Sequence, residues 1–464
     1  MSAPRELPKV LGLPDLVLFT VSAILLLDTL AASASIGPSS LFWWLFLGVV
    51  FLLPVGLITA ELATAYPEEG GVYVWIRRGL GRHWAARAVW AYWVNTAIWL
   101  PSIFILFAGV FSRLSGIDLS LPQQIGVGIA LAWLTALLDI LGLKVGKWVP
   151  NLGALFKMII FAVLIVAGWR YGQSNGFANP LTPEAFRPEW KEGLKYVPAI
   201  VYGMLGFELV SAASGEIRHP ARDMPLSIII SGLLVLAFYF LATAGILAAI
   251  PAEEINIVDG LIDTLALFFS EVPGGEFIVA ALGAMALFTF FSNGATWAMG
   301  CNRATAEAAV EGELPSPFAV RHKRHGGPIG AAILMGIVCT TVLLLYGRVA
   351  TSNADLFWSL FSFSAAIFML PYLGMVIAFA RLRFKDRQSA RPFRVPGGDF
   401  TACALAGLCA LTLLFAIALF LFVPGDGLQV PTIIGVITVL AIGEALIRIG
   451  MAERWLRDRS SRKG

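Results

Sequence analysis

Charged residues are scarce in this chain. Asp, Glu, Lys and Arg make up only 14% of its 464 residues, whereas 58% of the residues are hydrophobic. A soluble domain carries about 25% charged residues, so this composition excludes a soluble globular protein and indicates a polytopic membrane protein. The connections between the apolar stretches are also too short to hold a soluble catalytic domain. Whatever this protein does, it does within the membrane.

Cysteine and histidine are equally scarce, at four residues each. Cys301, Cys339, Cys403 and Cys409 lie in or beside apolar stretches without metal-ligand spacing, so the sequence predicts neither a disulfide framework nor a zinc site. The histidines fall in or near predicted loops, whereas a membrane enzyme or redox carrier needs histidines or acid pairs within its spans. We therefore expect no enzyme activity, no cofactor and no bound metal.

Twelve stretches are apolar for long enough to cross a bilayer core of about 30 Å, which takes about 20 helical residues. The sequence therefore predicts an all-α protein with twelve transmembrane helices. The first stretch lacks the short apolar core and small-residue cleavage site of a signal peptide, so we expect it to remain as a helix. The predicted spans are residues 13–36, 40–64, 84–113, 121–142, 148–170, 196–216, 226–250, 276–305, 327–346, 354–380, 400–423 and 428–449.

Lys and Arg residues are concentrated on one side of the predicted membrane. Basic clusters occur at Arg77–Arg87, Arg321–Arg324, Arg381–Arg394 and Arg454–Lys463. The connection between the seventh and eighth spans, on the other side, is acidic from Glu253 to Glu271. Because basic residues are retained on the cytoplasmic side, we expect a multi-pass protein of the cell (inner) membrane with both termini in the cytoplasm.

Two of the spans are interrupted by small and acidic residues. The first span breaks in residues 28–35, and the sixth breaks around residues 203–208. Irregular backbone at membrane depth is tolerated only where protein or a water-filled cavity satisfies its N–H and C=O groups. Matched breaks in two halves of a chain are typical of secondary transporters.

A broken helix can bind a small zwitterion or amine. One half-helix places its positive dipole end and free N–H groups at the bilayer midplane, and the other offers free carbonyls. In the first break the candidate contacts are Ala32, Ser33 and Ser35, within a predicted anion cradle from Ala31 to Ser35. In the second break the cradle runs from Gly203 to Gly206. The alternative is that these small residues only pack helix against helix.

The five-span separation of the two breaks predicts an inverted five-plus-five repeat. Each repeat begins with an interrupted helix, but the two helices enter the bilayer from opposite sides. The predicted organisation is a cytoplasmic segment over residues 1–12, a first repeat over 13–170, a second repeat over 196–380, two added helices over 400–449 and a short basic tail over 450–464.

Three isolated charges lie within the predicted spans, and such residues are functional candidates by default. Asp28 either meets the amine of a substrate, or is neutralised by a neighbouring helix or caps a half-helix. Lys157 either carries a coupling proton or is a permanently charged structural tether. Glu208 either serves as a proton-coupling or gating group, or makes a fixed hydrogen bond to the unwound backbone. By contrast, Glu61 and Glu216 lie near span ends, where we expect structural links to the basic loops.

Several motifs together show a family resemblance over nearly the whole chain. The chain resembles the amino acid–polyamine–organocation superfamily of transporters, and its pattern is similar to that of bacterial glutamate/γ-aminobutyrate-type antiporters. The residues that carry this resemblance are Pro54–Thr64, Glu69–Trp75, Gly206-Phe207-Glu208, Glu216–Pro225, Cys301-Asn302-Arg303 and Glu311–Pro315.

The resemblance implies a LeuT-like fold that binds substrate between spans 1, 3, 6, 8 and 10 and works by alternating access. Tyr202 falls where relatives keep an aromatic gate, and Trp297 falls where some relatives have a substrate-facing tryptophan. An aromatic face can hold an ammonium by cation–π attraction. Asn293, one helical turn before Trp297, is expected to face the same way. Gly203, Gly206 and Phe207 complete the expected site in the sixth span.

The resemblance also bears on ion coupling. Lys157 falls where sodium-independent relatives have a lysine in place of a sodium ion, so we expect its ammonium to hold carbonyls of the first span. Two departures from the family pattern stand out. The usual Gly-Ser-Gly stretch of the first span is replaced by Ala-Ala-Ser-Ala-Ser, and the chain has only a short basic tail in place of a C-terminal plug.

The sequence therefore predicts a sodium-independent secondary transporter of amino acids or related amines, working by exchange or with protons. The alternatives are a transporter-like amino acid sensor and a polyamine or biogenic-amine exchanger. The expected partners are a small amino acid or amine, protons and membrane lipid, with no nucleic acid. We expect a monomer or a homodimer.

Overall fold

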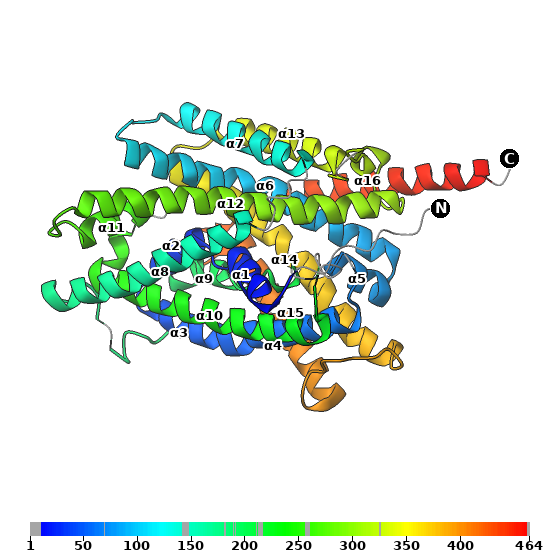
Figure 1. The fold of residues 1–464 in the computed structure, drawn as a ribbon, viewed down its shortest axis with the longest axis horizontal. Coiled ribbons are helices and arrows are strands. Elements are labelled where there is room, and N and C mark those ends of the chain that lie inside the picture. The colour runs from blue at the N-terminus through cyan, green and yellow to red at the C-terminus, as the bar shows by residue number, and fades with distance from the viewer. Residues whose placement is uncertain are drawn as a thin grey trace.

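The structure is a computed structural model that describes residues 11–68, 70–141, 148–180, 182–188, 190, 192–209, 211, 217–255, 260–323 and 326–461. Within these residues the chain is a bundle of long helices (Figure 1). The described strands form one small hairpin, in which β1 (Phe422–Val423) pairs with β2 (Gly427–Leu428). Glu69 and Glu216 lie outside the described residues.

Ten helices in the described part of the chain are long and apolar enough to cross a membrane. Their positions agree with ten of the twelve predicted spans. They are Ser39–Ala65, built from α3 (Ser39–Leu47), a π-helical turn (Gly48–Leu52) and α4 (Leu53–Ala65), together with α6 (Arg82–Ser115), α7 (Leu121–Leu141), α8 (Trp148–Asn175), α10 (Pro220–Ala249), α12 (Gly275–Val310), α13 (Ile329–Tyr346), α14 (Asn353–Lys385), α15 (Gly398–Leu421) and α16 (Val430–Ser461).

The other two predicted spans are the interrupted ones. The first consists of α1 (Leu13–Ile24) and α2 (Leu27–Ala34), which bend by 49° at the break between them. The sixth begins with the short α9 (Val197–Tyr202), which ends at the predicted break. Two further short helices, α5 (Val72–Leu80) and α11 (Gly260–Phe268), lie between spans.

The position of the first break differs from the prediction. The chain leaves the helix at Leu25 and Leu26, not in residues 28–35, and Asp28 lies in the first turn of α2. An acidic residue stabilises a helix N-terminus, so Asp28 begins the second half-helix rather than interrupting it. The small residues that follow are helical, and they allow α2 to pack closely against α10.

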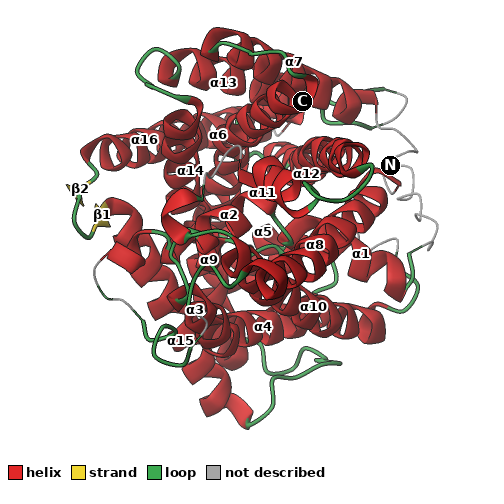
Figure 2. Ribbon diagram, turned by 90° about the vertical axis from the view of Figure 1, so that its left-hand side faces the viewer, coloured by secondary structure: helices red, strands yellow, loops and turns green. Residues whose placement is uncertain are grey.

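The interrupted helices lie in the centre of the bundle. Figure 2 looks along the long helices and shows α2 and α9 enclosed by the longer spans. α10 packs on α8, α1 and α4, whereas α12 packs on α6 and α8, and α14 packs on α6 and α15. Side chains of α2 and α9 are almost all buried, in keeping with this central place.

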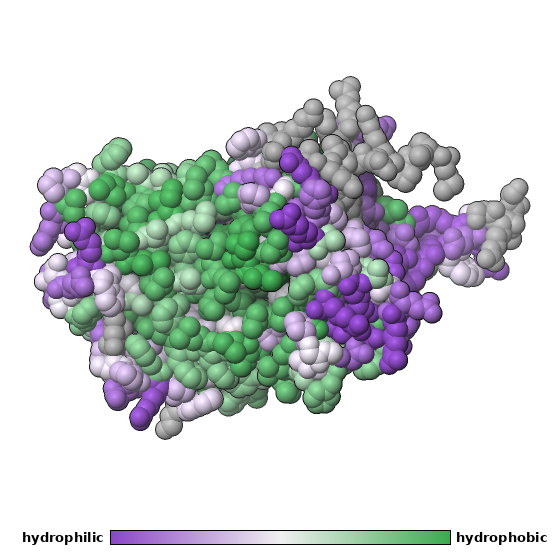
Figure 3. Space-filling model, turned by 60° about the horizontal axis from the view of Figure 1, so that its bottom comes forward, coloured by the Kyte–Doolittle hydropathy of each residue, from purple (hydrophilic) through white to green (hydrophobic). Residues whose placement is uncertain are grey.

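A broad apolar surface covers the middle of the bundle (Figure 3). Large side chains such as Leu233, Ile337 and Leu411 are exposed on it, as expected for helices that face hydrocarbon rather than water. Hydrophilic residues collect at the two ends, most densely at the end where α16 finishes. The end of the bundle where α16 finishes is called the basic end below.

A buried ion pair holds the basic end together. Glu61 of α4 accepts hydrogen bonds from Arg383 of α14 at 2.5 Å, from Arg391 at 2.9 Å and from the backbone N–H of Val395 at 2.7 Å. Arg383 also donates to Asp399 at 2.8 Å. The side chains of Glu61 and Arg383 are fully buried. The predicted structural link between Glu61 and the basic loops is confirmed.

We predict that Glu61→Gln lowers the thermal stability of the protein strongly. Breaking one side of a buried ion pair costs about 3–5 kcal/mol, because the remaining charge stays buried. Glu68→Gln is the matched control, since Glu68 pairs with Arg78 at the surface, where such pairs contribute about 0–1 kcal/mol. Thermal unfolding in detergent compares the two variants. Equal shifts in melting temperature would show that the Glu61 network carries no special weight.

Candidate functional site

The first break leaves backbone carbonyls at the end of α1 without helical partners, and side chains from other helices satisfy them. Lys157 of α8 donates from Nζ to the carbonyl oxygen of Ser22 at 2.6 Å. Trp297 of α12 donates from Nε1 to the carbonyl oxygen of Ala23 at 3.3 Å. Unpaired carbonyls at a helix end are costly in an apolar core, so these contacts stabilise the break. The contact between Lys157 and the first span has the form that the resemblance implied.

Tyr239 of α10 bridges the break itself. Its hydroxyl donates to the carbonyl oxygen of Ile24 at 2.9 Å and accepts from the backbone N–H of Leu26 at 2.6 Å. Its ring stacks on Trp44, with centroids 4.2 Å apart. The sequence analysis missed Tyr239. The available signal was a phenol within an apolar span, since a buried tyrosine hydroxyl usually has a hydrogen-bond partner.

Asp28 lies in the first turn of α2, and only one of its two carboxyl oxygens accepts a hydrogen bond in the described structure. Its Oδ1 accepts from the backbone N–H of Thr29 at 2.7 Å. Its Oδ2 is buried and has no hydrogen-bond partner among the described residues, and the same holds for Nε1 of Trp99. The indole N–H of Trp99 is directed at this carboxyl group, and the Lys157 ammonium interacts with it electrostatically. The expectation that Asp28 is the N-cap is wrong, because Leu26 holds that position, and Asp28 instead supports the first turn of α2 through its bond to Thr29.

The second break packs directly against the first. A Cβ atom on Gly203 would lie 2.5 Å from Cγ2 of Thr29, and one on Gly206 would lie 3.0 Å from Cγ1 of Ile24. Gly206 also has φ of 129°, a conformation that side-chain-bearing residues rarely adopt. Glycine at these two positions allows the backbone of the second break to lie directly against the side chains of Thr29 and Ile24.

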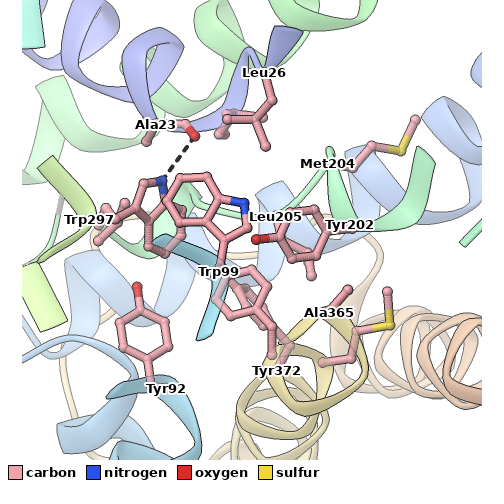
Figure 4. Packing of buried hydrophobic residues seen from close by; sticks show 14 of the residues in the cluster. Ala23, Leu26, Tyr92, Trp99, Tyr202, Met204, Leu205, Trp297, Ala365 and Tyr372 are labelled. Carbon is pink, nitrogen blue, oxygen red and sulfur yellow. Dashed lines mark hydrogen bonds between the residues drawn. The ribbon is translucent and has the colours of Figure 1, made fainter. Parts of the chain in front are cut away.

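Aromatic rings form a layer beside the two breaks (Figure 4). Phe368 of α14 lies at the centre of this layer, with its ring centroid 5.3 Å from both Tyr202 and Trp297. Tyr92 and Trp99 of α6 lie 6.0 Å and 6.3 Å from Trp297. The sequence analysis singled out Tyr202 and Trp297 but not Phe368, Tyr92 or Trp99. These five residues are called the aromatic layer.

Glu208 follows the second break and contacts this layer. Its Oε1 accepts from the hydroxyl of Tyr92 at 2.7 Å, whereas its Oε2 is buried without a hydrogen-bond partner in the described structure. Glu208 and Tyr92 line a cavity of about 360 Å³ that also includes Tyr73 of α5 and Arg303 of α12. Arg303 is exposed, so the cavity leads from the solvent at the basic end to the Glu208 carboxyl group.

The structure brings together only part of the predicted site. Asp28, Tyr202, Gly203, Gly206 and Trp297 surround the two breaks. Asn293, another predicted site residue, is bonded to Lys157. Its side-chain oxygen accepts a hydrogen bond from Nζ of Lys157 at 3.2 Å. Phe207 points elsewhere, since its ring lies against Gly56 of α4 and Gly232 of α10.

The predicted anion cradle from Ala31 to Ser35 is wrong for this structure, because the segment is part of a helix. The backbone N–H of Ser35 bonds to the carbonyl oxygen of Ala31 at 3.1 Å. The Ser35 hydroxyl donates to the same carbonyl at 3.0 Å, and the Ser33 hydroxyl donates to Leu30 at 2.9 Å. Ala32 is buried within the same helix. These groups are occupied and do not form an open cradle.

The chain is similar in sequence to known transporters. The chain is 31% identical over 439 residues to the probable agmatine/putrescine antiporter AguD of Lactococcus lactis subsp. lactis, covering 93% of each chain. It is 25% identical over 407 residues to a glutamate/gamma-aminobutyrate antiporter of the same organism, covering 82% of this chain and 78% of the relative. It is also 26% identical over 424 residues to the polyamine transporter PUT1 of Oryza sativa subsp. japonica, covering 89% and 73%.

A family model described as amino acid permease matches residues 11–443. The family and these relatives are transporters, not enzymes. The match includes both helix breaks, the aromatic layer and the buried charges around them. This chain therefore belongs to the amino acid permease family, within the amino acid–polyamine–organocation superfamily.

Proposed function

We propose that this protein is a secondary transporter that exchanges small amines across the cell membrane without sodium. One observation carries the proposal: a carboxylate oxygen of Asp28 is buried without a partner beside the aromatic layer. A buried charge without a partner is costly, and an ammonium group is the natural partner for it. Aromatic faces around the ammonium add cation–π attraction of about 2 kcal/mol when desolvated.

The second carboxyl group favours an amine with two positive ends. Glu208 lies beside Tyr92, and its Oε2 is also buried and unpartnered. Both carboxyl groups interact electrostatically with tyrosines at the aromatic layer. Asp28 interacts with Tyr202, and Glu208 interacts with Tyr92 and with the neighbouring Tyr372. A diamine or guanidino-amine can meet one carboxylate with each end. The names of the relatives, which include agmatine, putrescine and polyamines, support this choice.

A substrate carboxylate has a weaker claim on the site. The N-terminus of α2 is where such a group would be expected to bind, but Asp28 already accepts a hydrogen bond there. The segment from Ala31 to Ser35 offers no free N–H groups in its place. Glutamate is therefore disfavoured as a substrate, although the glutamate/gamma-aminobutyrate antiporter is a relative. An amino acid whose side chain carries an amine is the second candidate.

The proposed architecture has twelve spans in two inverted repeats of five plus two added helices. The interrupted helices α1–α2 and α9 begin the two repeats, and their breaks contact each other. α15 and α16 are the added pair. The basic end faces the cytoplasm in this proposal, because basic loops are retained there. Alternating access then exposes the two breaks to each side in turn.

Lys157 takes the place of a bound sodium ion in this proposal. Its ammonium already holds the Ser22 carbonyl, and a second cation at that place would be repelled. Either Lys157 or Glu208 can carry a coupling proton, since both are buried next to a break. A sensor of amines with little turnover would use the same site. Measured transport separates that alternative from the proposal.

The proposal predicts exchange of labelled putrescine or agmatine in proteoliposomes loaded with the same unlabelled amine. Counterflow is expected with these amines and not with glutamate, because a second carboxylate in the site would meet Asp28 and Glu208. Uptake is expected to be the same when sodium is replaced by potassium. Tight binding without uptake would favour the sensor, and uptake that requires sodium would overturn the role given to Lys157.

Asp28→Asn is predicted to weaken amine transport about 10- to 100-fold. The loss corresponds to a charge-assisted hydrogen bond of about 1.5–3 kcal/mol. The amide keeps the shape of the side chain and can still accept from Thr29, so the variant tests the charge. Ser33→Ala is the matched control on α2, since that hydroxyl donates to Leu30 of its own helix, lies 3.4 Å from the Thr243 hydroxyl of α10 and carries no charge. Unchanged apparent affinity in the Asp28 variant would exclude amine binding at this residue.

Lys157→Met is predicted to abolish transport while the protein remains folded. The change leaves the Ser22 carbonyl without its donor and removes the positive charge beside Asp28. The break would then lose one of its side-chain supports in the transport cycle. The measurement is counterflow between pH 5 and 8, with size-exclusion chromatography to confirm folding. A variant that transports at the normal rate with an unchanged pH profile would show that Lys157 is dispensable.

A further inference from the structure

The last helix of the protein extends beyond its neighbours at the basic end (Figure 1). One side of this extension is anchored to the loop that follows α12. Glu453 accepts at Oε2 from the backbone N–H of Ser316 at 2.8 Å, and Arg454 donates to the carbonyl oxygen of Glu311 at 3.1 Å. These contacts fix the rotation of α16 about its axis, so the residues on its other face have a defined position.

That other face carries exposed basic and aromatic side chains. Arg448, Trp455 and Arg459 follow Glu444 by 4, 11 and 15 residues, which are each close to whole numbers of helical turns. The Arg448 side chain is 78% exposed and Trp455 is 56% exposed. The Arg459 guanidinium lies 4.5 Å from the Trp455 ring centroid. Figure 3 shows the hydrophilic surface of this projecting segment.

The beginning of α6 continues the same surface. Arg87 pairs with Glu444 at 3.0 Å, and Arg448 shares the same carboxyl group at 3.4 Å. Trp84, one turn before Arg87, is 58% exposed and lies 5.3 Å beneath the Arg87 guanidinium. We call Trp84, Arg87, Arg448, Trp455 and Arg459 the α6–α16 patch. Three arginines against one glutamate give this surface a formal charge of +2.

From this geometry we infer that the α6–α16 patch binds the headgroup of an anionic phospholipid in the leaflet at the basic end. Its phosphate contacts Arg448, which shares the Glu444 carboxylate with Arg87. A guanidinium is the side chain best suited to a phosphate, because it can donate two parallel hydrogen bonds. Arg459 contributes a second positive charge further out.

The position of the patch identifies its occupant as a lipid. The face of α16 below Arg448 exposes Ile437 and Leu440 among other apolar side chains, as in a helix that faces hydrocarbon. From Arg448 to Trp455 the helix rises about 10 Å, which is somewhat more than the headgroup region of about 5–8 Å on one side of a bilayer. Tryptophan is enriched at this level of a membrane, and basic residues just outside a span attract anionic lipid. The exposure of Trp84 and Trp455 is therefore explained by a membrane interface and not by contact with water.

The test measures binding of phosphatidylglycerol and phosphatidylcholine to the purified full-length protein by native mass spectrometry. Phosphatidylglycerol is expected to bind more tightly. Arg448→Gln and Arg459→Gln are each expected to weaken it about fivefold, in line with the usual contribution of one basic residue near a membrane surface. Arg457→Gln is the matched control, because Arg457 is an exposed arginine on a different face of the same segment, and it is expected to change binding less than twofold.

Four results would overturn the inference. Equal weakening by Arg457→Gln would show a diffuse charge effect rather than a site. Equal affinity for the two lipids, or competition by soluble glycerol phosphate at the same concentration as the lipid, would show that the headgroup in the membrane is not recognised. A dimer that Trp455→Ala dissociates, with lipid binding unchanged, would assign the patch to a second copy of this chain.

Discussion

The structure depends on hydrogen bonds to a stretch of backbone that has left its helix. Three carbonyls at the end of α1 have lost their helical donors, and each accepts from a side chain on a different long helix, α8, α10 or α12. Without these donors the break would carry several kcal/mol of unsatisfied polar groups in an apolar surrounding. The break therefore fixes how α8, α10 and α12 are placed around the centre.

The same arrangement explains why charges are concentrated at the centre of an otherwise apolar bundle. Lys157 serves the α1 end of the break, and Asp28 serves the α2 end. The positive and negative side chains each stabilise the backbone dipole nearest to them. One oxygen of Asp28 is left without a partner, so in the proposed function the same residue supports the break and binds the cationic substrate. The two roles of Asp28 link the fold to the proposed function.

The sequence was sufficient for some parts of the site and insufficient for others, for physical reasons. A lysine in an apolar run is conspicuous, so Lys157 could be found and its contact with the first span anticipated. The break at Leu25 and Leu26 could not, because two leucines look the same in a helix and in a hydrogen-bonded gap. Phe368 was missed for a related reason: the chain has 32 phenylalanines, and only the tertiary fold decides which of them meets Tyr202 and Trp297.

The predicted architecture fared in the same way. Ten uninterrupted spans followed from length and hydropathy alone, since a helix must hide its backbone from hydrocarbon whatever its neighbours are. The interrupted spans needed knowledge of which helix supplies each donor, which no local pattern contains. The small residues from Ala31 to Ser35 would allow an irregular backbone to approach a ligand closely. Close packing of one helix on another requires the same small residues, so the sequence does not distinguish the two cases.

The two broken helices are in direct contact. Gly203 packs against the Thr29 side chain, and Gly206 packs against the Ile24 side chain. At both positions a glycine meets a side chain of the first span directly, so the contact contains no free space and α9 cannot rotate without displacing the α1–α2 junction. The first and sixth predicted spans are therefore mechanically coupled where their breaks meet. Under the proposed function, release of a substrate bound there requires both helices to move together.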